Sequence, residues 1–478
     1  MQSCHTPGAT SAVFDDPNLV SFAGLVPVMA LARMAGLQEL SDQHLRVPSD
    51  KGANPGLKVS SLVAGMVAGA DSIDDMAMLR HGGMRRVFAR IYAPSTLGSF
   101  LRAFTFGHVR QLDAVASRFL ARLSTRAPLL RVAPGERVMV DIDDTIIEVH
   151  GYTKIGSGYG YTRVRGLNAI IASVSTATSA PVIVAQRLRK GACGSQRGAK
   201  QLIKEALSCL RRLNDDTART SAAPRPLVRA DSAFYSAPMI NAALRAGADV
   251  SVTLRSTLNV RTAIASIPDE AWTPIQYNDA IYDEETRRWI SSAEVAEVPF
   301  TAFVSRPRAE RVTARLVVRR IPDLNPPDTT SESVQEALFR TWRFHAFLTT
   351  VTPHGPHGMD TVTADKTHRR HAIIEQVHAD LKNSALAHLP SASFAANSAW
   401  LVLAVIAFNL SRAAGTITGP DLARATTATI RRKLITVPAR AATSARRITL
   451  HLPRQWPWEQ AWTTLFNYSC GPPPTTAT

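Results

Sequence analysis

The order of short apolar runs and amphipathic segments between residues 138 and 254 constrains the fold of this chain more than any other feature. Runs rich in β-branched side chains are typical of buried strands, whereas apolar residues at three- and four-residue spacing indicate a helix. The pattern predicts strands at 138–143, 159–175 and 181–188, a helix at 197–213, a strand at 227–231, a helix at 237–246 and a strand at 249–254. This order predicts an α/β fold built on a mixed sheet with flanking helices.

Three strands followed by a helix, a strand, a helix and a strand is the order of a ribonuclease H-like core. Alternating runs separated by prolines predict that a β-rich insertion interrupts this core, and a helix resumes near residue 367. The chain is therefore expected to contain a helical region at 1–130, a first part of the core at 131–255, the β-rich insertion at 256–350, a second part of the core at 351–415 and a basic, helical C-terminal region at 416–478.

The charge of the chain indicates a polyanionic partner. It carries 55 Lys and Arg residues against 38 Asp and Glu, a formal net charge of +17. Self-repulsion makes such an excess costly unless a polyanion offsets it, which favours nucleic acid; a merely arginine-rich or ribosome-associated protein is the alternative. Residues 422–458 contain eight Lys or Arg and no acid, and we expect Arg431, Arg432 and Lys433 to lie along DNA phosphates. The first 130 residues read either as a DNA-binding helical region or as an ordinary helical bundle.

Cysteine usage and hydropathy favour a cytoplasmic protein. The four cysteines are scattered and lack CxxC spacing, which argues against a structural zinc site and against a secreted disulfide framework. No signal-peptide pattern is visible at the N-terminus. The apolar run at 401–410 is about half the length that spans a bilayer, so no membrane partner is expected.

Carboxylates gather where two predicted strands end. By strand alternation Asp141 and Asp143 share one face, and Asp144 points to the other. Close like charges repel unless a cation lies between them, so this cluster favours metal binding over a turn or helix cap. Asp231 ends the fourth predicted strand, and active sites of open α/β sheets gather at the carboxyl ends of parallel strands.

A third acid lies on the helix predicted after the insertion. At about 100° per residue, His368, His371, Glu375 and Lys382 fall within roughly 60° of one another on this helix. The face offers a carboxylate for metal and basic groups for phosphate; a surface ion pair is the alternative for Glu375 and Lys382. Carboxylates from separate elements are what two divalent ions need to catalyse phosphodiester chemistry.

Several stretches in a fixed order carry a resemblance to one family. They include VDIDDTIIEVHGYTKIGSGYGYTRVRGLNAI, RLRKGACGSQRGAK, VRADSAFY and HRRHAIIEQVHADLKN. With these stretches the chain resembles DDE-type insertion-sequence transposases, specifically the bacterial group known as the thirteen-eighty family. The resemblance implies that the first acid is Asp143 in a D-x-T element, the second is Asp231 in the RADS element, and the third is Glu375 followed by Lys382.

The resemblance also implies partners and cofactors. It implies two Mg²⁺ or Mn²⁺ ions per active site, held by these three acids; Asp141 is a further candidate ligand. The expected substrates are double-stranded DNA carrying terminal inverted repeats, and target DNA, with the protein a dimer on DNA. Relatives use a Trp in the insertion to stack on a flipped base, which makes Trp289 and Trp342 candidates; a Trp packed in the core is the alternative for each.

The chain departs from the broader superfamily in the segment before Glu375. The superfamily has Tyr and Arg seven and four residues before the acid, where this chain has His368 and His371. Arg369 and Arg370 lie between the two histidines and are alternative candidates for contacts to DNA phosphate.

Two other functions remain open at this point. The chain would be a DNA-binding relative of transposases if it had lost catalysis. The stretch DIDDT also satisfies the D-x-D-x-T motif of haloacid-dehalogenase-type phosphohydrolases, in which Asp141 and Asp143 would act on a small phosphate ester. The net charge disfavours this second alternative, because small-molecule hydrolysis does not require it.

Overall fold

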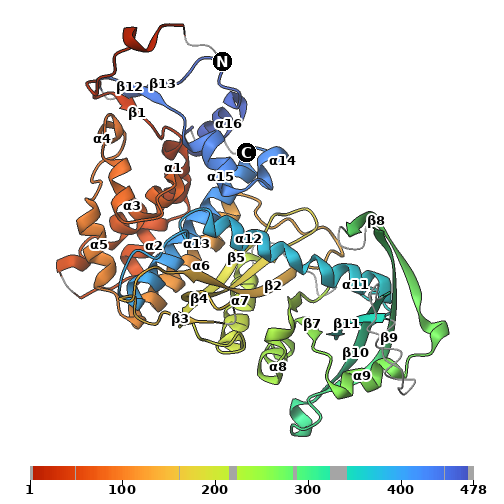
Figure 1. The fold of residues 1–478 in the computed structure, drawn as a ribbon. Coiled ribbons are helices and arrows are strands. Elements are labelled where there is room, and N and C mark those ends of the chain that lie inside the picture. Colours follow the sequence, from red (N-terminus) through yellow and green to blue (C-terminus); the bar gives the residue numbers. More distant parts are fainter. Residues whose placement is uncertain are drawn as a thin grey trace, which may run out of the picture.

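A computed structural model describes residues 4–48, 50–160, 162–214, 223–283, 288–322, 342–445 and 447–471 of the chain. At its centre is a mixed sheet with helices packed against it (Figure 1). The first part of this core contains β2 (Met139–Glu148), β3 (Gly158–Tyr159), β4 (Arg165–Ser175), β5 (Val182–Arg189), α7 (Ala199–Asn214), β6 (Leu227–Ala230), α8 (Ala237–Arg245) and β7 (Asp249–Leu254). The predicted order of strands and helices between residues 138 and 254 is thus confirmed.

The core strands lie in the order β5-β4-β2-β6-β7. β4 runs antiparallel to both β2 and β5, while β6 runs parallel to β2 and to β7. Consequently β2, β6 and β7 run in the same direction, and β2 continues beyond the level at which β6 ends.

The β-rich segment extends this sheet. It contains α9 (Leu258–Ala265), β8 (Thr273–Asp283), β9 (Arg288–Ala302), β10 (Val312–Pro322) and β11 (Trp342–Thr349). Its last strand, β11, pairs antiparallel with β7, so the sheet continues in the order β7-β11-β10-β9-β8. These strands fit the predicted β-rich insertion, and they extend the core sheet beyond β7.

The two ends of the chain pack together. The first contains β1 (Leu19–Val20), α1 (Leu25–Met34), α2 (Leu37–His44), α3 (Pro55–Ala68), α4 (Met84–Val87), α5 (Pro94–Arg102) and α6 (Phe106–Arg126). The other contains α14 (Pro420–Ala423), α15 (Thr427–Ile430), a π-helical turn (Arg431–Ile435), β12 (Ala439–Ser444), β13 (Arg447–His451) and α16 (Glu459–Cys470). β1 pairs with β12, and α1 packs against α16 (Figure 1).

The sequence predicted a helical C-terminal region. This prediction is wrong in part, because the region also contains β12 and β13. In β12, Ala439 and Ala441 are buried and Arg440 and Ala442 are exposed, a period of two that fits a strand and not a helix. The strand was not predicted from the sequence, because its buried positions hold only alanine and the alternation of buried and exposed residues is short.

A long apolar helix, α13 (Phe394–Ile417), passes through the core. Among the described residues it is the one helix long and apolar enough to cross a membrane, but 89% of its apolar stretch is buried inside the protein. It packs against α3, α6 and β5. Asn409 accepts a hydrogen bond from the Ile183 amide at 3.0 Å and donates one to the Ile183 carbonyl at 2.8 Å, so it satisfies both backbone polar groups of this residue in β5.

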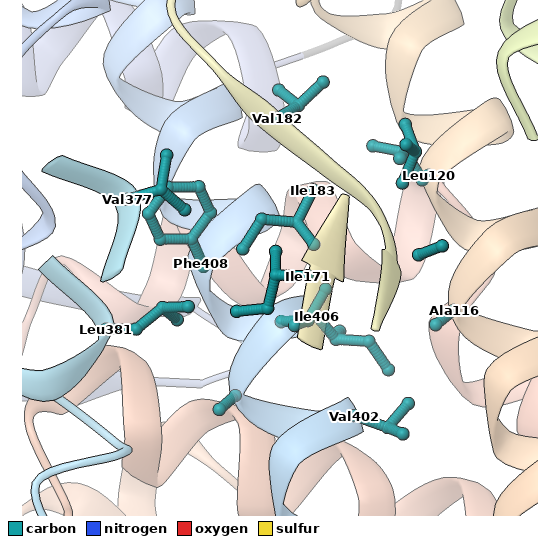
Figure 2. Close-up of a cluster of buried hydrophobic side chains, with 14 of the residues drawn as sticks. Ala116, Leu120, Ile171, Val182, Ile183, Val377, Leu381, Val402, Ile406 and Phe408 are labelled. Carbon is teal, nitrogen blue, oxygen red and sulfur yellow. The ribbon is translucent and has the colours of Figure 1, made fainter. Parts of the chain in front are cut away.

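The helix that follows the insertion is anchored on this core. α11 (Thr361–Arg369) continues through a short 3₁₀ turn (Arg370–Ala372) into α12 (Ile373–Lys382). Figure 2 shows Val377 and Leu381 of α12 beside Phe408 of α13. The apolar side of α12 is thereby buried. The helix also packs against β2, and this contact fixes the position of its polar side relative to the sheet.

Candidate active site

Two aspartates sit side by side on neighbouring parallel strands. In the β2–β6 ladder Ile142 lies opposite Ala230, so Asp143 and Asp231 are the next residues along each strand. Asp231 directly follows β6, and its carboxylate accepts a hydrogen bond from the Ala233 amide at 3.0 Å. Burial, and then the negative charge of Asp143, raise the pKa of Asp231. The two acids are close enough to feel each other's charge.

The sequence predicted that Asp141 and Asp143 lie at the end of their strand. The structure shows otherwise. β2 continues to Glu148 because it pairs with β4 along its whole length, from Met139 opposite Ser175 to Glu148 opposite Gly166. The carboxylates therefore lie within a long strand, at the level where the shorter β6 ends. A strand interior held by β4 on one side gives Asp143 a rigid base.

Glu375 reaches the same region from α12. Its neighbours Ile374 and Val377 are buried, and Glu375 itself is exposed. Asp143, Asp231 and Glu375 all line one pocket of about 330 Å³, which we call the acid pocket. The structure thus brings a residue of β2, a residue after β6 and a residue of α12 to the wall of one cavity.

The donor chemistry of the acid pocket fits a hard divalent cation. All three acids offer carboxylate oxygens, which Mg²⁺ prefers, and the mutual repulsion of Asp143 and Asp231 is a cost that a cation would remove. Across the described ranges, no three His, Cys, Asp or Glu side chains are grouped closely enough to hold a metal ion as they stand. The three acids thus line the same pocket, but their side chains are not close enough together to coordinate one ion as they stand.

Asp141, the other candidate ligand, is engaged elsewhere. It is fully buried and accepts hydrogen bonds from Arg229 Nε at 2.7 Å and Arg229 Nη2 at 2.8 Å. His371 Nδ1 lies 2.9 Å from Asp141 Oδ1. Burial alone would raise the pKa of Asp141, but the Arg229 guanidinium and the His371 contact hold it below its ordinary value. Because both carboxylate oxygens have partners, the geometry favours Asp143 over Asp141 as a metal ligand.

Asp144 faces the other side of β2, as strand alternation predicts. It is buried and forms an ion pair with Arg189, and it accepts a hydrogen bond from Asn168 at 3.1 Å. This acid has a structural role away from the acid pocket.

The two histidines before Glu375 are held within the protein. His368 stacks on Phe347 at 4.1 Å, and its ring nitrogens lie 2.8 Å from Ser251 Oγ and 2.9 Å from Thr253 Oγ1. Burial lowers the pKa of His368 to about 3, so its ring is neutral. A neutral ring with both nitrogens bonded has nothing to offer a phosphate, which argues against the expected DNA contact. His371, through Asp141, ties the 3₁₀ turn to β2.

The basic residues expected to contact DNA are separated in space. Arg369 lines the acid pocket, whereas Arg370 lines a different, larger pocket. Lys382 is exposed in the last turn of α12. Arg431, Arg432 and Lys433 lie in the π-helical turn of the C-terminal region, where the Lys433 ammonium is 5.1 Å from the centre of the Trp458 ring. Arg369 is the candidate that the fold brings to the acids.

The structure describes the side chain of only one of the two tryptophans that are candidates for base stacking. The Arg320 guanidinium lies between Trp342 and Trp272, 4.4 Å and 4.3 Å from the ring centres, so one face of Trp342 is covered. Trp289 belongs to β9, but its side chain lies outside the described residues.

Two residues at this site were not singled out from the sequence. Arg229 lies two residues before Asp231 on β6, and strand alternation would have placed it on the same face, opposite Asp141. His378 follows Glu375 by three residues on α12, and its Nε2 is 3.4 Å from Asp143 Oδ2. The spacing of Glu375 and His378 was a usable signal, because residues three apart on a helix are neighbours.

Comparison with known proteins identifies the family of this chain. Residues 8–468 match the family described as transposase DDE domain group 1. No curated protein matches the chain. The match covers the helical N-terminal region, the sheet with its three acids and most of the C-terminal region. The chain therefore belongs to the transposase DDE domain group 1 family.

Proposed function

We propose that this protein is a metal-dependent DNA transposase that cleaves transposon ends and joins them to target DNA, with Asp143, Asp231 and Glu375 as its catalytic acids. The observation that carries the proposal is their shared position at the acid pocket. The strand order β5-β4-β2-β6-β7 supports a ribonuclease H-like core. The finer assignment to the thirteen-eighty family rests on the quoted sequence stretches.

The three acids would hold one or two Mg²⁺ or Mn²⁺ ions, which supply charge neutralisation at the scissile phosphate and activation of the attacking oxygen. The chain's own residues set the geometry. β2 and the end of β6 present Asp143 and Asp231 from a rigid sheet. Arg229 joins this sheet to the helical segment, because its Nη1 donates to the Thr367 carbonyl at 2.6 Å while its other nitrogens hold Asp141. Arg369, at the pocket wall, would contact a phosphate.

DNA would lie over more than the acid pocket. The N-terminal helical region and the basic C-terminal segment pack together through β1 and β12, so they would bind terminal repeats as one unit. Joining two ends requires at least a dimer on DNA, and action on DNA in the bacterial cytoplasm follows from the proposed role.

The test uses the full-length protein and labelled DNA that carries the inverted repeats flanking its coding sequence. In Mg²⁺ or Mn²⁺ we expect strand cleavage at the repeat ends, followed by joining of the new 3′ ends to a target plasmid, and EDTA should abolish both. Salt-sensitive binding without cleavage in either metal would instead identify a DNA-binding relative that has lost catalysis. Turnover of a chromogenic phosphate ester without DNA would favour the phosphohydrolase, which the full burial of Asp141 already disfavours.

Lys382→Ala is expected to weaken DNA binding to a similar extent for all sequences, and to reduce the slope of log affinity against log salt by about one. The reason is that Lys382 is an exposed cation two helical turns beyond Glu375. Affinity is measured by fluorescence anisotropy at several salt concentrations. Lys204→Ala is the matched control, because Lys204 is an exposed lysine on α7 that lines a different pocket. An unchanged slope for Lys382→Ala would remove Lys382 from the DNA interface.

A further inference from the structure

His378 is a buried histidine next to the acid pocket. It lies one turn after Glu375 on α12, and it is 6% exposed between the core residues Val377 and Leu381. Its Nε2 is 3.4 Å from Asp143 Oδ2. His378 therefore shares a helix with Glu375 and lies close to the strand-borne Asp143.

The ring of His378 lacks hydrogen bonds. In the part of the chain that the structure describes, neither Nδ1 nor Nε2 has a hydrogen-bond partner. Leaving such a buried group unsatisfied costs about 1–3 kcal/mol, so a native protein seldom does so without a reason. The two preceding histidines differ: His368 is bonded to Ser251 and Thr253, and His371 to Asp141. Only His378 of this helical segment directs an unbonded nitrogen toward one of the three acids.

The separation of the two donor atoms suits a shared cation. Ligands at adjacent corners of an octahedron with bonds of about 2.1 Å lie about 3 Å apart. The 3.4 Å between His378 Nε2 and Asp143 Oδ2 is close to that value and lacks hydrogen-bond geometry. Glu375 and His378, three residues apart, present a carboxylate and an imidazole from one side of a helix, a spacing that other helical proteins use for metal ligands.

We propose that His378 is a nitrogen ligand of the divalent cation that Asp143 holds. This inference rests on the proposed metal-dependent function and adds a fourth residue to its site. A consequence concerns metal choice: Mg²⁺ prefers oxygen donors, whereas later first-row ions accept imidazole more readily. The site should therefore bind Mn²⁺ more tightly than three carboxylates alone would, with little gain for Mg²⁺.

The test examines full-length protein loaded with Mn²⁺ by electron spin echo envelope modulation, which detects a nitrogen bound to the ion. We expect nitrogen coupling in the wild type and its loss in both His378→Asn and His378→Phe. Calorimetry should show Mn²⁺ affinity reduced by about tenfold or more in these variants. The affinity for Mg²⁺ should change by less than about threefold. The phenylalanine variant fills the space of the ring, and circular dichroism in EDTA verifies that each variant is folded.

Two controls separate this inference from the proposed function. His388→Ala removes a histidine that is 61% exposed and lies near Asp71, and it should leave the nitrogen signal and both affinities unchanged. Asp143→Asn tests the metal site itself: Mn²⁺ binding as tight as in the wild type would contradict the proposed function. Absence of nitrogen coupling in the wild type, or its persistence in both His378 variants, would overturn the assignment of His378 while leaving the three acids in place.

Discussion

Asp231→Asn is expected to lower the rate of end cleavage by at least about a thousandfold, equivalent to roughly 4 kcal/mol of transition-state stabilisation. The substitution removes the negative charge that would hold the cation. It keeps an oxygen that accepts the hydrogen bond from the Ala233 amide, so the turn after β6 should be preserved. Single-turnover cleavage of labelled end DNA measures the rate, and anisotropy with the same DNA should show affinity equal to or above that of the wild type, because a negative charge is lost.

The matched control is Asp269→Asn. Asp269 is 91% exposed, lies outside the acid pocket and contacts Arg320 at 3.3 Å, so the same chemical change there should leave cleavage intact. Glu375→Gln should behave as Asp231→Asn does, because both side chains line the acid pocket. Cleavage by Asp231→Asn at the wild-type rate would remove Asp231 from the catalytic machinery.

The local pattern of the sequence was sufficient to predict the core strands. β-branched runs and helical spacing specify each element independently of its partners, and the order of elements then leaves few ways to arrange them. The extent of β2 was not predictable in this way. The residues after Asp143 include Asp144 and Thr145, which read as the end of a strand. Their place within the strand depends on pairing with β4, and the burial of Asp144 depends on the ion pair with Arg189.

Partners distant in the chain account for most of what the sequence left open at the site. Alternation placed Asp141 and Asp143 on one face, but the assignment of one to structure and the other to the pocket depends on Arg229, 88 residues beyond Asp141. The role of His368 also depends on distant residues, although the helical pattern placed it on the same face as Glu375. Its nitrogens are bonded to Ser251 and Thr253 of β7, and no local pattern indicates those contacts.

The pairing of Asp141 with Arg229 leads to the second large expected effect. Arg229→Met should destabilise the sheet by about 3–5 kcal/mol, because it leaves a buried carboxylate without its compensating charge. Asp141 is 0% exposed and Arg229 is 2% exposed, so water cannot replace the lost partner. The variant also loses the hydrogen bond to the Thr367 carbonyl, which ties α11 to β6. Hydrogen exchange of the β2 and β6 amides measures this free energy locally, which suits a chain too large for two-state unfolding.

Two further variants serve as controls for Arg229→Met. Arg122→Met breaks an exposed pair with Glu39, whose side chains are 45% and 57% exposed, and should cost less than about 1 kcal/mol. The double variant Asp141→Leu/Arg229→Met removes both buried charges and should regain part of the stability lost by Arg229→Met alone. Since the pKa of Asp141 is lowered in the folded protein, its contribution is complete above about pH 4 and is lost as the pH falls further, so exchange at neutral pH captures all of it. Equal effects of Arg229→Met and Arg122→Met would show that the buried pair does not hold the helical segment against the sheet.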